Sequence, residues 1–133
     1  MNVAYLFTIL YLLGDMFYVY SSKSFYGAVV QKIQGKPITM KTYAWVSIAL
    51  SYLFLALGWF YIIATRVSST TSYKELITLA LIYGLAVYGV FNTTLYVTFD
   101  QWNAFVSFRD TLWGVGWILT VSLLYLYISK NKK

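Results

Sequence analysis

The sequence contains neither cysteine nor histidine, only one proline and only four acidic residues among its 133 positions. Without cysteine the chain has no disulfide, no thiolate metal site and no thiol nucleophile. Without histidine it lacks the commonest metal ligand and the commonest general base of enzymes. We therefore expect no enzymatic activity, no bound metal and no other cofactor.

Charge of either sign is also scarce, since charged residues make up 11% of the chain, against 60% hydrophobic and 21% aromatic residues. An average soluble domain carries about 25% charged residues. The composition therefore predicts an integral membrane protein, and the length fits a single domain over residues 1–133. The net charge of +6 suits contact with anionic lipid headgroups. We expect no nucleic-acid partner.

Four apolar runs are long enough to cross a bilayer, at about residues 3–21, 42–65, 76–99 and 102–128. At ~1.5 Å per residue, even the first of these just covers a hydrocarbon core of ~30 Å. The first run has no basic leader and no small-residue cleavage site, so we expect it to be retained. The pattern predicts an all-α, four-helix membrane bundle with both termini on one side.

A fifth, shorter helix is predicted at about residues 24–34, in the loop after the first run. Its apolar residues recur at the spacing of one helix face, namely Phe25, Tyr26, Val29, Val30 and Ile33. Gly35 and Pro37 then provide a stop. An amphipathic helix in the membrane interface would direct Lys23, Lys32 and Lys36 toward lipid headgroups. A loop helix packed on the bundle fits the same pattern, and both interpretations stay open.

Basic residues give no clear orientation, because the two sides of the membrane carry almost equal numbers of them. The termini side holds five: Arg66, Lys74, Lys130, Lys132 and Lys133. The other side, which we call the lysine side, holds four: Lys23, Lys32, Lys36 and Lys41. Our working expectation is a multi-pass protein with cytoplasmic termini, in a membrane that the sequence does not specify.

Polar residues within the spans are costly in lipid and seldom without a reason. Asp15, Asn92 and Asp110 each fall roughly 8 to 12 Å inside the lysine side, at ~1.5 Å per residue. Three spans thus present polar groups at one level. The predicted polar cluster comprises Asp15, Asn92, Thr94, Arg109 and Asp110. The helical phase predicts that it is lined by Tyr18, Tyr88, Trp113 and Gly114.

Two interpretations of this cluster remain open. In the first, Arg109 pairs with Asp15 or Asp110, and the network only fixes the register of the helices. In the second, the acidic residues bind or relay a cation, a proton or a polar headgroup. Two carboxylates with one arginine leave one carboxylate unbalanced, which keeps the second interpretation in play.

The last third of the chain resembles a known family. Phe91-Asn92-x-Thr94, then Trp102, then Asp110-x-x-Trp113-Gly114 is similar to the hallmark of domain of unknown function 2177. That family comprises small membrane proteins of bacteria and large DNA viruses. Asn92 stands where the family has an acidic residue, and Leu95 where it has asparagine. The resemblance implies four spanning helices and brings no activity with it.

Two functions follow from these expectations. The first is a small transporter or channel component that uses the polar cluster. The alternative is a non-catalytic structural or accessory subunit of a viral or organellar membrane assembly. Membrane lipids are expected partners in both cases, together with protein subunits or further copies of the chain. An open cavity that reaches Asp110 would favour transport, and a closed salt bridge would favour the accessory role.

Overall fold

The computed structural model describes residues 3–131, and every regular element in that range is a helix. This confirms the all-α fold class. In chain order the elements are α1 (Val3–Ser21), α2 (Lys23–Gln34), α3 (Thr42–Ile62), the 3₁₀ helix η1 (Ala64–Arg66), α4 (Tyr73–Gly84), the π-helical turn η2 (Leu85–Gly89), α5 (Val90–Thr98) and α6 (Ala104–Asn131).

Four helical stretches are long and apolar enough to cross a membrane: Val3–Ser21, Thr42–Arg66, Tyr73–Thr98 and Ala104–Asn131. The third begins at Tyr73, where the sequence predicted a start near 76. Ser72 explains the earlier start, because its hydroxyl accepts a 3.1 Å hydrogen bond from the backbone N–H of Glu75. This Ser-x-x-Glu arrangement caps a helix N-terminus, so the charged residues near it form the first turn.

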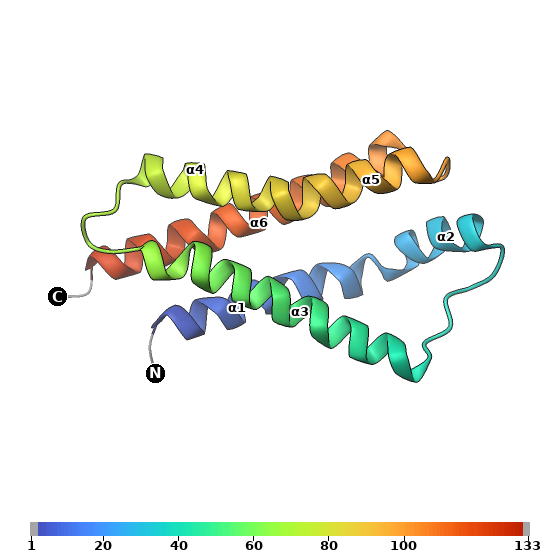
Figure 1. The fold of residues 1–133 in the computed structure, drawn as a ribbon, viewed down its shortest axis with the longest axis horizontal. Coiled ribbons are helices and arrows are strands. Elements are labelled where there is room, and N and C mark those ends of the chain that lie inside the picture. The colour runs from blue at the N-terminus through green and yellow to red at the C-terminus, as the bar shows by residue number, and fades with distance from the viewer. Residues whose placement is uncertain (1–2, 132–133) are drawn as a thin grey trace.

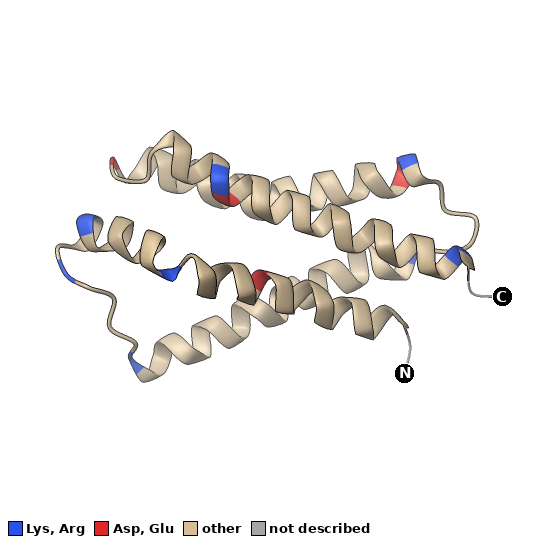
Figure 2. Ribbon diagram, turned by 180° about the vertical axis from the view of Figure 1, so that it is seen from behind, with Lys and Arg blue, Asp and Glu red and all other residues tan. Residues whose placement is uncertain are grey.

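The helices form two groups that meet along α1 and α6. In Figure 1, α4 and α5 form one rod beside α6, while α1 and α3 cross each other. The described chain begins and ends at one end of the bundle, and α2 lies at the other end with the turn between α5 and α6. Figure 2 shows that most charged positions lie at these two ends. The ends correspond to the termini side and the lysine side.

The hydrophobic core occupies the half of the bundle nearest the termini. There Trp59 fills the centre, fully buried, and its indole N–H donates a 3.1 Å hydrogen bond to the Ser122 hydroxyl. The core comprises Ala4, Phe7, Tyr11, Trp59, Ile63, Ala64, Leu76, Ala80, Tyr83, Ile118, Val121, Tyr125 and Leu126. Because lipid is as apolar as these side chains, close packing rather than water exclusion holds this half together.

The first half of α3 is not covered by other helices. Within α3 only Trp59 is buried, whereas Trp45 and Val46 in the first half are 62% and 59% exposed. Figure 1 shows this part of α3 running away from α1 and α2 toward the lysine side. The helices therefore separate at that end.

Helix α2 follows α1 after a bend at Ser22 and continues toward the lysine side (Figure 1). Its side chains Phe25, Tyr26, Val29, Val30 and Ile33 are half-buried, whereas Lys23, Lys32 and Lys36 are exposed. Gly35 ends the helix with a φ of 74°, a left-handed conformation that glycine adopts without strain, and its N–H bonds to the carbonyl of Gln31.

Candidate functional site

Asp110 on α6 accepts hydrogen bonds from two other helices. Its Oδ1 accepts one of 3.0 Å from the Tyr26 hydroxyl of α2, and its Oδ2 accepts one of 2.7 Å from the Asn92 amide of α5. The Tyr26 hydroxyl also lies 2.5 Å from that of Tyr18. Burial, then the contact with Tyr18 and the charge of Asp110, raises the pKa of the Tyr26 phenol. The phenol is therefore a proton donor to the carboxylate.

Asn92 connects this site to the third span and to the turn before α6. The side chain is only 1% exposed, and all its hydrogen-bonding atoms have partners. Besides Asp110, its amide group donates to the backbone carbonyl of Tyr88 at 2.9 Å. Its Oδ1 accepts a 3.1 Å bond from the indole N–H of Trp102. Asn92 is thus fixed in one orientation, with its amide group toward Asp110.

Asp15 forms the second carboxylate site, on α1. It is 6% exposed, and its Oδ1 accepts a 2.5 Å hydrogen bond from the Tyr88 hydroxyl. The hydroxyl of Tyr52, from α3, also interacts with this carboxylate. Asp15 and Asp110 lie close enough to interact electrostatically. Tyr88 connects the two sites: its hydroxyl donates to Asp15, and its backbone carbonyl accepts from Asn92.

The π-helical turn η2 places Tyr88 in this position. A π turn inserts an extra residue into a helix, shifts the phase of the following side chains and is frequent at functional sites. Here the Tyr88 carbonyl accepts hydrogen bonds from the Asn92 amide and, at 3.4 Å, from the Thr111 hydroxyl. Gly114 lets the Tyr88 ring pack against α6, because a Cβ at Gly114 would overlap that ring.

Arg109 does not pair with either carboxylate, contrary to the salt bridge that the sequence predicted. Its guanidinium donates a 3.1 Å hydrogen bond to the Ser22 hydroxyl, between α1 and α2, and lies 4.3 Å from the centre of the Phe25 ring. Within residues 3–131, no acidic side chain is within ion-pair distance of it. The physical reason is helical phase: neighbouring residues point about 100° apart, so Arg109 reaches the bend at Ser22 while Asp110 points toward Asn92.

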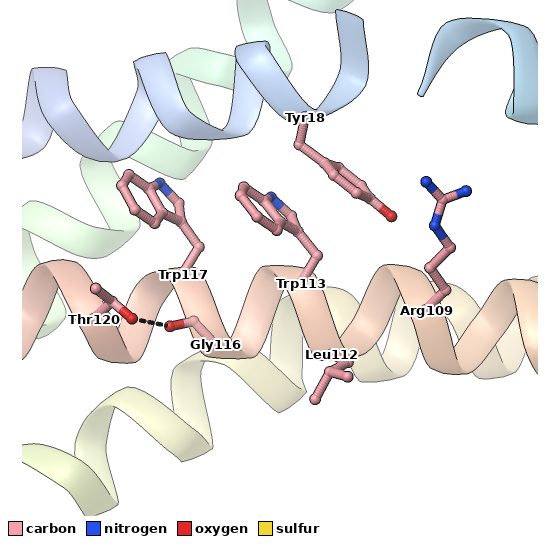
Figure 3. Close-up of a pocket in the computed structure, with 7 residues that line it drawn as sticks. All are labelled: Tyr18, Arg109, Leu112, Trp113, Gly116, Trp117 and Thr120. Carbon is pink, nitrogen blue, oxygen red and sulfur yellow. Dashed lines mark hydrogen bonds between the residues drawn. The ribbon is translucent and has the colours of Figure 1, made fainter. Parts of the chain in front are cut away.

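Two other predicted residues also lie away from the carboxylates. Thr94 is exposed, and its hydroxyl bonds to the carbonyl of Val90 in its own helix. Trp113 stacks on the Tyr18 ring, with ring centres 4.7 Å apart, and does not lie against a carboxylate (Figure 3). The structure thus brings together Asp15, Asn92 and Asp110 with Tyr18, Tyr88 and Gly114, and leaves Thr94 outside.

The sequence analysis did not predict three residues that take part in the hydrogen-bond network around Asp15, Asn92 and Asp110, namely Tyr26, Tyr52 and Trp102. Tyr26 lies on the apolar face of the short predicted helix, and an aromatic residue at such a position is usually interpreted as a packing residue. Trp102 lies within the matched family motif, yet its partner Asn92 could not be inferred from spacing. The position of Tyr52 depends on how α3 crosses α1, which no periodicity encodes.

A lateral groove of about 630 Å³ opens beside the network, between α1, α2 and the first half of α3. Its walls are apolar, with Met16, Val30 and Ile48 among them. Its lining also includes the charged residues Lys23 and Asp110 and the hydroxyl-bearing residues Tyr20, Tyr26 and Tyr52. The groove therefore leads from the lipid-facing surface to the carboxylate of Asp110.

This arrangement can bind a cation or a hydrogen-bond donor at Asp110, or pass a proton between neighbouring hydroxyls and carboxylates. No three acidic side chains come together anywhere in the described part of the chain.

No curated protein and no solved structure matches the chain. A family model described as "Predicted membrane protein (DUF2177)" matches residues 1–127. Its four apolar helices indicate a multi-pass membrane protein, and the chain belongs to the DUF2177 family of predicted membrane proteins.

Proposed function

We propose that the protein is a small membrane transporter, or the substrate-binding subunit of one, which receives an amphiphilic cation from the lipid at Asp110. The observation that carries this proposal is the lateral groove, whose lining includes both Asp110 and its donor Tyr26. A groove of about 630 Å³ has the volume typical of small-molecule sites.

The lining of the groove favours an amine with an apolar tail. Its walls would hold the tail, and the carboxylate of Asp110 would bind the ammonium group by a charge-assisted hydrogen bond. Lys23, the other charged lining residue, belongs to the first turn of α2, where its ammonium lies 4.5 Å from the centre of the Tyr20 ring. Entry sideways from lipid would keep the ligand away from that positive charge.

The alternative is a non-catalytic accessory subunit, and the closed hydrogen bonding of the network favours it. Asn92 and both oxygens of Asp110 already have partners within the chain. In that role the uncovered half of α3 would contact another subunit or a second copy. Neither role requires enzymatic chemistry, a cofactor or nucleic acid, and we propose none. Cytoplasmic termini remain part of the proposal, although Lys132 and Lys133 lie outside the described residues.

Ligand titration in nanodiscs tests the proposal, because Trp45 and Trp102 line the groove and report binding by fluorescence. Dodecylamine should change the tryptophan emission saturably, and dodecyl sulfate should not. Asp110→Asn should lower the affinity for dodecylamine at least about tenfold, because it removes the charge partner. Asp100→Asn, at the exposed corner, is the matched control and should bind like the wild type. Proteoliposome uptake of the amine should follow the same order.

Equal dodecylamine binding by the wild type and the folded Asp110→Asn variant would overturn the transport role. Retention of both α-helical content and partner proteins in that variant would then favour the accessory role.

A further inference from the structure

A second groove, of about 410 Å³, lies on α6 and is separate from the lateral groove. We call it the aromatic groove; its lining residues are Tyr18, Arg109, Leu112, Trp113, Gly116, Trp117 and Thr120. Figure 3 shows Arg109, Trp113 and Trp117 all projecting from α6 toward α1, with the Tyr18 ring between Arg109 and Trp113. The groove therefore has a cationic end and an aromatic wall.

Among residues 3–131, the cation at this end has no anionic partner. Arg109 donates only one hydrogen bond, from Nη2 to the neutral hydroxyl of Ser22, within residues 3–131. Three aromatic rings surround the guanidinium, with centres 4.3 Å away for Phe25, 5.7 Å for Tyr26 and 5.8 Å for Tyr18. A guanidinium presents five N–H donors and binds phosphate in a bidentate manner. Arg109 therefore keeps donors available for an anion.

Arg109 lies at the level where the first span ends. The first span ends at Ser21, and the next residue, Ser22, accepts the Arg109 hydrogen bond. The guanidinium thus lies beside the end of α1 on the lysine side, where we expect the lipid phosphates. From Arg109 to Thr120 the groove follows α6 for about 16 Å at ~1.5 Å per residue, close to half of a ~30 Å hydrocarbon core. This is the length of one lipid tail in one leaflet.

The wall of the groove suits an acyl chain. The rings of Tyr18, Trp113 and Trp117 stack in series, with centres 4.7 and 5.9 Å apart and planes within 10° and 11° of parallel. Gly116 opens the wall further along, since a Cβ placed there would meet no other atom within 4 Å. We propose that the aromatic groove binds an anionic glycerophospholipid, with its phosphate on Arg109 and one acyl chain along Trp113, Gly116 and Trp117.

The aromatic groove shares no lining residue with the lateral groove, so native mass spectrometry can test lipid binding separately from ligand binding at Asp110. The protein is exposed to an equimolar mixture of phosphatidylglycerol and phosphatidylcholine with identical acyl chains, and the bound lipids are counted. The wild type should retain phosphatidylglycerol preferentially. Arg109→Gln should reduce that preference at least about fivefold, the effect expected for one basic residue near a membrane surface. Arg66→Gln, which removes the arginine at the opposite end, should keep it.

Gly116→Leu tests the acyl chain separately, because the added side chain enters the groove and leaves Arg109 intact. The open space at Gly116 predicts that this variant folds, so it also carries the test if Arg109→Gln does not fold. It should retain less of both diacyl lipids. An unchanged lipid preference in Arg109→Gln, an equal loss in Arg66→Gln, or undiminished lipid retention in Gly116→Leu would each overturn the proposal.

Discussion

The two ends of the bundle solve the problem of helix association in opposite ways. At the termini side, buried apolar side chains from α1, α3, α4 and α6 meet around Trp59. At the lysine side, the buried groups include Asp15, Ser22 and Asn92, and α3 separates from its neighbours. Packing thus holds one end, and hydrogen bonds hold the other. An end held by a few directional bonds is the end at which a ligand can enter.

Two tryptophans on α3 give the largest expected contrast. Trp59 is fully buried at the closed end, and Trp45 is 62% exposed at the open end. Trp59→Ala should lower the free energy of unfolding by about 3–5 kcal/mol, because it leaves a large cavity. Trp45→Ala should change it by no more than about 0.5 kcal/mol. Unfolding by dodecyl sulfate in mixed micelles measures both, and equal effects would contradict the contrast between the ends.

Two glycines on α6 give the next contrast. A Cβ at Gly114 would overlap the Tyr88 ring, whereas one at Gly116 would meet nothing within 4 Å. Gly114→Ala should therefore destabilise the protein by about 1–3 kcal/mol through overpacking. Gly116→Ala should stabilise it by up to about 1 kcal/mol, because alanine favours a helix more than glycine does. The same mixed-micelle titration decides, and a stable Gly114→Ala variant would show that α6 does not approach η2 closely.

The hydrogen-bond network around Asp110 gives an effect of comparable size. Asp110→Asn presents one N–H₂ group to the two donors Tyr26 and Asn92, so one hydrogen bond is lost. We expect a loss of about 1–3 kcal/mol of unfolding free energy. Asp100→Asn, at the exposed corner before α6, should leave it unchanged. If both variants unfold alike, Asp110 does not help to hold the lysine side together.

The smallest effect concerns the titration of Tyr26. Because its pKa is raised in the folded state, the unfolded chain loses this proton first, near pH ~10. Its contribution to stability is therefore complete below that pH and is lost as the pH rises further. The fall of unfolding free energy above pH ~10 should be steeper in the wild type than in Tyr26→Phe. Identical slopes would mean that the phenol is not buried.

Much of the fold follows from the sequence, because long uncharged runs have few other stable forms. The depth argument, from residue counts along each span, placed Asp15, Asn92 and Asp110 near the lysine side. In the structure Asn92 and Asp110 are hydrogen-bonded, and Asp15 joins them through Tyr88. Counting along a helix gives depth reliably, since the rise per residue is nearly constant.

The direction in which a side chain points around the helix axis was harder to predict than its depth along the helix. The π turn at Leu85–Gly89 changes the phase of the third span, and Thr94, after it, faces away from the network. Arg109 was expected beside an acidic residue, yet its partner Ser22 lies in a bend between two helices. The separation of the first half of α3 from α1 could likewise not be predicted, because both helices are apolar around most of their circumference.

The central claim is that α3 is covered at one end and open at the other. Since the chain has no native cysteine, single cysteines can be placed along Thr42–Ile62 and spin-labelled in nanodiscs. We predict low accessibility to lipid-dissolved oxygen at Leu55, which packs against the core, and high accessibility at Trp45 and Ile48, which line the lateral groove. Accessibility at Trp45 and Ile48 as low as at Leu55 would contradict this.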